Sequence, residues 1–166
     1  EVAFGLGSGV DSLVASEKSF NTMLAALREG DLNLGIRGAE TNARILREIS
    51  SVETAWAPIS EASKAIALGM PAKDVIARIT SLDPGLLDAT EKLIATISGT
   101  YTNPDLPFEA VMAINIAGGQ EVLLEKIAKD SCLASSGEAS YADKAAQLAE
   151  NIAQFEQTHS ALTAGM

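Results

Sequence analysis

The feature that most constrains this chain is a long run of apolar residues spaced three or four positions apart. Its members are Ile45, Ile49, Val52, Trp56, Ile59, Ala62 and Ile66. Such spacing puts every member on one face of an α-helix and is typical of a helix that packs in a bundle. We expect this helix to begin near Thr41, to end near Gly69 and to kink at Pro58.

Similar spacing and helix-ending residues predict the remaining helices. Leu13 to Leu27 forms one helix, which Gly30 ends, and residues 29–42 form a polar loop. A short helix opens at Pro71, and a second helix has Asp83 as its N-cap and Pro84 as its first residue. Two longer helices follow, from about Phe108 to Leu133 and from Tyr141 to Leu162, separated by "ASSGEAS".

Composition agrees with a helical fold. Of 166 residues, 47% are hydrophobic but only 4% are aromatic, and five prolines interrupt the chain. This favours helices packed on helices over a sheet protein. We therefore predict an all-α single domain, an antiparallel four-helix-bundle-like fold with one or two short extra helices.

The net charge of -10 limits the possible partners. Nucleic-acid binding requires clustered lysine and arginine, and an anionic membrane surface attracts basic segments, so neither partner is expected. No stretch approaches the roughly 20 apolar residues of a membrane span, which predicts no direct membrane insertion. The first residues also lack the pattern of a signal peptide. The segment is expected to be cytosolic or an extracytoplasmic portion without its targeting segment.

An internal similarity suggests a repeat. "FNTMLAALREG", from Phe20, matches "FEQTHSALTAG", from Phe155, at its phenylalanine, alanine, leucine and final glycine. The offset is 135 residues. The chain is therefore expected to begin partway through one repeat unit and to end partway through the next.

Two adjacent glycines lie inside the predicted helix that contains "INIAGGQEVLLEKIAKD". Each costs roughly 1 kcal/mol relative to alanine in a helix interior, so Gly118 and Gly119 require a reason. Close packing of two helices is favoured over a ligand or a hinge, because glycine permits close backbone contact.

The same stretch resembles the "AGRQRMLSQ(R/K)(M/I)(A/S)K" signature of the PilJ-type sensor domain, the N-terminal region of type IV pili methyl-accepting chemotaxis transducers. "FNTMLAALREGDLNLGI", "VETAWAPI" and "ITSLDPGLLDATEKLIATI" resemble further segments of that family in the family's order. The resemblance implies a non-catalytic, extracytoplasmic (periplasmic) helical bundle that senses a ligand. It also divides the domain into residues 1–106, one unit without its signature, and 107–166, the start of a second unit.

In members that sense nitrate, signature arginines hold the anion, and the signature helix pairs across a dimer. Here those arginines correspond to Gly119 and Glu121, and the signature methionine corresponds to Val122. A carboxylate in place of a guanidinium reverses the local field, so the resemblance implies a small polar or cationic ligand rather than an anion. A homodimer or a partner helix is the alternative, as in a free-standing interaction module without a small ligand. The candidate ligand-binding residues are Asn115, Gly118, Gly119, Gln120, Glu121 and Lys126.

Other candidate sites have simpler structural interpretations. "EQTH" matches one Glu-x-x-His element of di-iron bundles, but one histidine cannot complete that site, and we expect His159 to be buried or half-buried. Cys132 is interpreted as a buried small apolar residue and Trp56 as a core anchor. No cofactor, metal site or catalytic set is predicted, and an enzyme is not expected.

Overall fold

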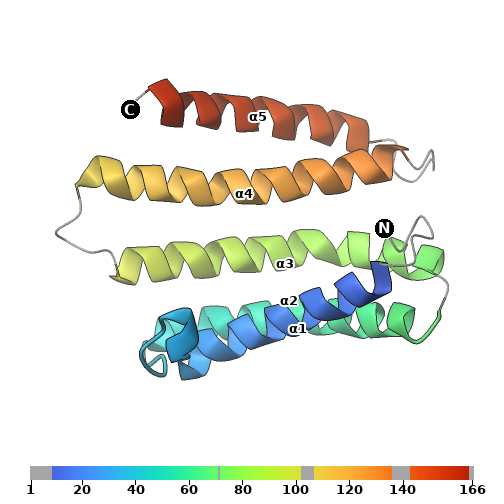
Figure 1. Cartoon of the computed structure of the whole chain (residues 1–166), viewed down its shortest axis with the longest axis horizontal. Helices are drawn as coiled ribbons and strands as arrows, with labels where there is room; N and C mark the ends of the chain where they lie inside the picture. The colour runs from blue at the N-terminus through green and yellow to red at the C-terminus, as the bar shows by residue number, and fades with distance from the viewer. Residues whose placement is uncertain (1–8, 71, 102–106, 136–142, 165–166) are drawn as a thin grey trace. The chain divides into compact units, whose positions relative to one another are not determined.

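The structure, a computed structural model, describes residues 9–70, 72–101, 107–135 and 143–164. All of its long elements are helices, five among the described residues, so the predicted all-α helical bundle is confirmed (Figure 1). The chain divides into two compact units, Glu1–Tyr101 and Thr102–Met166, which are described separately below. The prediction of one domain divided at residue 106 stays a prediction.

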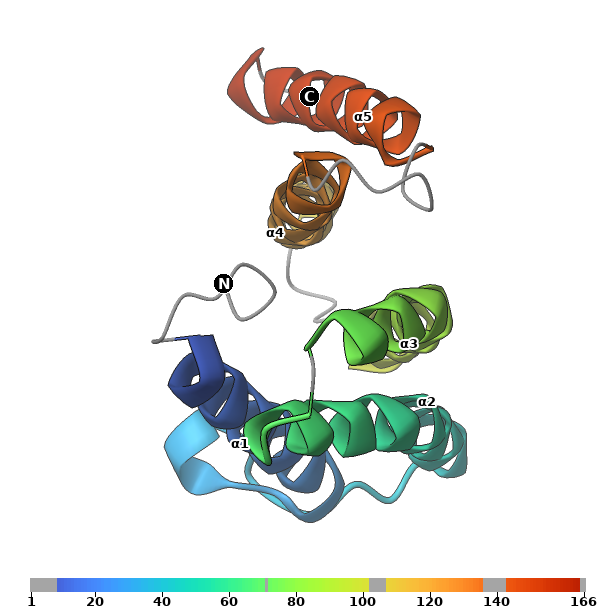
Figure 2. The same cartoon turned by 90° about the vertical axis from the view of Figure 1, so that its right-hand side faces the viewer.

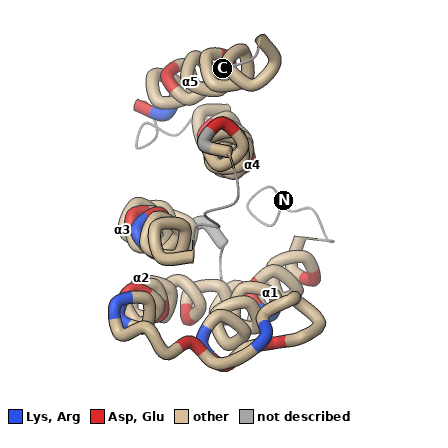
Figure 3. The backbone as a smooth tube through the Cα atoms, turned by 90° about the vertical axis from the view of Figure 1, so that its left-hand side faces the viewer, with Lys and Arg blue, Asp and Glu red and all other residues tan. Residues whose placement is uncertain are grey.

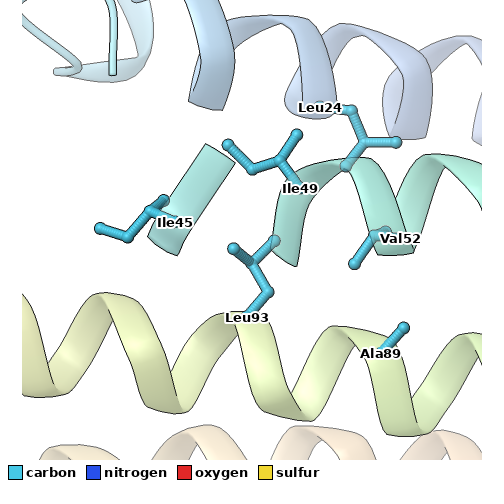
Figure 4. Packing of buried hydrophobic residues seen from close by; sticks show 6 residues of the cluster. All are labelled: Leu24, Ile45, Ile49, Val52, Ala89 and Leu93. Atoms are coloured by element: carbon cyan, nitrogen blue, oxygen red, sulfur yellow. The ribbon is translucent and has the colours of Figure 1, made fainter. Parts of the chain in front are cut away.

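The first unit contains α1 (Gly9–Glu29), the 3-10 helix η2 (Leu32–Leu34), α2 (Ala43–Ala67) and α3 (Ala72–Tyr101). Both α1 and α3 pack on α2 (Figure 2). Their shared core is built from one residue of α1, three of α2 and two of α3 (Figure 4), namely Leu24, Ile45, Ile49, Val52, Ala89 and Leu93. The three α2 residues are the deepest, which confirms that the 3–4 spacing marks the face α2 buries.

The ends of the helices in the first unit follow from local chemistry. Asn42 caps α2 by accepting hydrogen bonds from the backbone N–H groups of Arg44 and Ile45. Gly30 ends α1 with φ of 85°, and a Cβ at this position would lie 2.6 Å from the backbone of Gly38. Only glycine satisfies both conditions, so Gly30 fixes how the loop turns back on α1. Gly69 ends α2 in the same backbone region.

The structure corrects the prediction of two helices between Pro71 and Ile97. Residues 72–101 form one helix, with Pro84 in its interior, and Pro71 itself lies outside the described residues. The apolar spacing continues through the proline, because Val75 and Ile79 lie on the same face as Leu86 and Leu93. Continuous packing on α2 therefore outweighs the lost hydrogen bond at Pro84. Pro58 likewise lies inside α2 without ending it.

The second unit is a helical hairpin of α4 (Phe108–Ser135) and α5 (Lys144–Ala164). These bounds confirm the two predicted helices to within about three residues. The predicted start of the second helix, Tyr141, lies outside the described residues. Leu123 is the one apolar side chain of this unit that is classed as buried among the described residues. The hairpin therefore has little core of its own.

The two segments of the predicted internal repeat are both helical. Phe20 to Glu29 lies in α1, and Phe155 to Ala164 lies in α5. That they belong to two copies of one repeat unit stays a prediction.

Among the described residues, none of the helices combines the length and the apolarity needed to cross a membrane.

Candidate functional site

The candidate site lies on α4, where the predicted ligand-binding residues occur. Gln120 is 9% exposed and faces α5. Its Nε2 donates to the carbonyl oxygen of Phe155 at 3.2 Å and to the hydroxyl of Thr158. Its Oε1 has no hydrogen-bond partner among the described residues. Gln120 therefore belongs to the contact between α4 and α5.

A second polar contact joins the two helices ten residues further along α4. Asp130 is 3% exposed, and its Oδ2 accepts a hydrogen bond from Asn151 at 3.1 Å. The ammonium of Lys144 lies 3.6 Å from the other carboxylate oxygen and also donates to Gln147. Because a buried carboxylate is costly without partners, these groups fix the position of α5 along α4.

The structure separates the six predicted site residues onto different faces of α4. Gly119 follows Asn115 by four residues and Lys126 follows Gly119 by seven, so these three residues share one face of α4. Asn115, Gly118, Gly119 and Glu121 are exposed, and Lys126 is half-buried. Gln120 points instead toward α5. Within the second unit, Gln120 therefore holds α4 against α5, and the other predicted residues lie outside this contact.

The two glycines do not mediate packing within the hairpin. A Cβ added to Gly118 or Gly119 would meet no described atom within 4 Å. The predicted role in close packing is therefore wrong for the contact between α4 and α5. Instead, the pair leaves the backbone of α4 uncovered by side chains at its centre.

Two further predictions of burial are wrong. His159 is exposed and stacks on Phe155, with ring centroids 5.9 Å apart. Cys132 is also exposed, since it lies on the side of α4 away from Gln120 and Asp130. In the part of the chain that the structure describes, no three potential metal ligands come together.

Sequence reasoning missed Asp130, Lys144, Asn151 and Thr158. A usable signal existed, because Gln120 and Asp130 continue the 3–4 spacing of Leu123 and Ile127. Polar residues at apolar positions of a helix indicate a specific buried contact.

The comparisons with known proteins concern the second unit. Residues 110–166 match the PilJ family model, described as the type IV pili methyl-accepting chemotaxis transducer N-terminal domain. The match covers about a third of the chain and includes nearly all of α4 and the whole of α5. The resemblance is thus confirmed for this segment, while its extension to residues 1–106 stays a prediction. No curated protein and no solved structure is significantly similar to the chain.

Proposed function

We propose that this chain is part of a non-catalytic sensory protein of the chemotaxis-transducer type, acting outside the cytoplasm. The observation that carries this proposal is the match of residues 110–166 to the transducer family. The matched segment coincides with a hairpin whose contact is polar at two points, Gln120 and Asp130. A contact that depends on a few polar groups and little apolar burial allows α4 to shift relative to α5.

The proposed mechanism is a shift of α4 relative to α5. With one apolar side chain classed as buried among its described residues, the hairpin resists such a shift mainly through its polar contacts. A ligand that binds one arrangement more tightly moves the population toward it. A ligand bound near the centre of α4 would have the largest effect on its position relative to α5. The predicted residues near this centre are Asn115, Gly118, Gly119, Gln120 and Glu121.

The ligand class follows from charge. Glu121 is exposed and supplies a carboxylate where the family signature has an arginine. Ammonium groups and neutral hydrogen-bond donors suit a carboxylate, whereas an oxyanion does not. We therefore assign the exposed face of α4, including Lys126 at its edge, to a small polar or cationic ligand.

Charge reversal tests this assignment in the full chain. Calorimetry with nitrate should detect no binding to the unmodified protein and binding to Glu121→Arg, because a guanidinium restores an anion contact. Glu125→Arg, the same change one turn further along α4, is the matched control and should not bind nitrate. Absence of binding to Glu121→Arg would contradict a ligand site at this position.

One observation favours a second candidate, a helix-pairing module without a small ligand. Ile114, one turn before Gly118, is 62% exposed, and Leu124, further along α4, is 52% exposed. A partner helix could bury these side chains. Light scattering over a range of concentrations separates the candidates. A concentration-dependent dimer that Gly119→Leu disrupts supports pairing, and a strict monomer supports the sensor.

A further inference from the structure

The groove between α1 and α2 in the first unit is a second, independent candidate site. It has a volume of about 490 Å³ and is lined only by residues of these two helices. Its middle is apolar, formed by Leu24, Ala25, Trp56 and Ala57. Charged side chains lie toward both ends, and Figure 3 shows both signs of charge on α1 and α2.

At one end of the groove, one carboxylate has no cationic partner among the described residues. Arg28 forms a two-pronged ion pair with Glu53, with nitrogen to oxygen distances of 2.7 and 3.2 Å. The same guanidinium donates to Ser50 at 3.0 Å. Arg28 is thus neutralised by Glu53, whereas Glu29 lines the groove and forms no ion pair with a described residue. This end has a net negative charge.

The other end has the same imbalance. Glu17 is 9% exposed, accepts a hydrogen bond from Ser60 at 2.6 Å and lies 3.2 Å from the ammonium of Lys64. The hydroxyl of Ser60 lowers the pKa of Glu17, so this carboxylate is ionised and neutralises Lys64. Glu61 lines the groove beside them and forms no ion pair with a described residue.

Trp56 is held at the centre of the groove. Its indole N–H donates to Asn21 at 2.8 Å, and its ring lies against Phe20, with centroids 4.3 Å apart. The ring is thus fixed in orientation while it lines the groove. An aromatic face attracts an organic cation and also covers the methylene groups of a chain.

We propose that this groove binds a linear aliphatic polyamine, a molecule with cationic groups at both ends and an apolar chain between them. Among the described residues of the groove, the unpaired carboxylates are Glu29, beside the pair of Arg28 and Glu53, and Glu61, beside the pair of Glu17 and Lys64. The two ends are separated by the eight residues from Glu53 to Glu61 on α2, about 12 Å at the rise of an α-helix. An extended triamine such as spermidine spans this length, and its internal ammonium lies over the ring of Trp56. Its ends meet the two negative ends of the groove, and its methylene groups lie on Trp56 and Leu24.

The full chain provides its own probe, because Trp56 is its single tryptophan. At constant ionic strength, spermidine should change the tryptophan fluorescence in a saturable way, and butylamine and Mg²⁺ should not. Glu61→Gln should weaken spermidine binding about tenfold, since it removes one charge-assisted contact. Calorimetry on the same proteins gives an independent measure of the same affinity.

Glu150→Gln is the matched control, an identical change of charge at an exposed position of α5. It should leave spermidine binding within about twofold, because it lies outside the groove. Equal weakening by both variants would show general attraction to an acidic protein and would overturn the proposal. So would an equal response to Mg²⁺. The nitrate experiment concerns α4 alone, so either proposal can fail without the other.

Discussion

At the scale of single residues, the buried carboxylate of Asp130 is the most consequential contact of the second unit. Replacing Asp130 by alanine removes the hydrogen-bond acceptor of Asn151 and the ion-pair partner of Lys144. We expect the free energy of unfolding to fall by about 2 kcal/mol, measured by urea denaturation. Glu125→Ala, an exposed carboxylate of the same helix, should change it by less than about 0.5 kcal/mol. Similar losses in both variants would contradict this role for Asp130.

Glu40 makes the stability of the first unit depend on pH. It accepts hydrogen bonds from the backbone N–H of Asn42 at 2.7 Å, from that of Thr41 at 2.8 Å and from the hydroxyl of Tyr101 at 2.8 Å. The bond from Asn42 is the main cause that lowers the pKa of Glu40 below its ordinary value of 4.5. The folded state therefore binds this proton less readily than the unfolded state does.

The sign of the pH effect follows from this difference. The stabilisation from Glu40 is fully present above pH 4.5 and is lost as the pH falls through the lower folded pKa. We expect the thermal midpoint to fall less between pH 5 and pH 3 in Glu40→Gln than in the unmodified protein. Glu150→Gln should keep the full dependence on pH. An unchanged slope in Glu40→Gln would contradict the assignment.

At the scale of helices, the glycine pair provides a direct test of what α4 contacts. Because an added Cβ meets no described atom, Gly118→Ala and Gly119→Ala should each stabilise α4 by about 1 kcal/mol. Chemical denaturation of the full chain measures this gain. A loss of stability would instead place another backbone against the glycines, which is the contact a partner helix requires.

Pro84 tests whether α3 is one helix. Inside a helix, proline removes a hydrogen bond and clashes with the preceding turn, at a cost of about 3 kcal/mol. Pro84 is exposed, so Pro84→Ala removes this cost with little loss of packing. We expect a gain in the free energy of unfolding of up to about 3 kcal/mol. At the first turn of a separate helix, proline costs little, and the same change would have almost no effect.

These elements also show how far the sequence could be interpreted. The 3–4 spacing of Ile45, Ile49 and Val52 predicted the buried face of α2, because burial requires that period. Asp83 and Pro84 have the residue types of a helix start, yet they lie inside α3. Local residue types do not reveal that packing on α2 carries the helix through the proline. Gln120 was predicted as a ligand-binding residue but is buried against α5, because a buried amide and a ligand-binding amide look alike in sequence.

At the scale of the whole molecule, the two units differ in how much core they contain. Almost all of the buried apolar side chains among the described residues belong to residues 9–101, and Leu123 is the exception. Isolated helices are marginal in water without a packed apolar face. The first unit therefore has the means to fold alone, and the hairpin of α4 and α5 does not.

Separate fragments test this difference. Residues 1–101 should unfold cooperatively, with a clear thermal midpoint in circular dichroism, because the core around Ile49 and Leu93 lies within that fragment. Residues 102–166 should show reduced helicity and a broad transition, since their polar contacts at Gln120 and Asp130 cannot replace a core. A sharp transition of the second fragment at the midpoint of the full chain would contradict this prediction. Loss of structure in residues 102–166 alone would mean that the proposed sensing by α4 depends on a partner that covers its exposed apolar side chains.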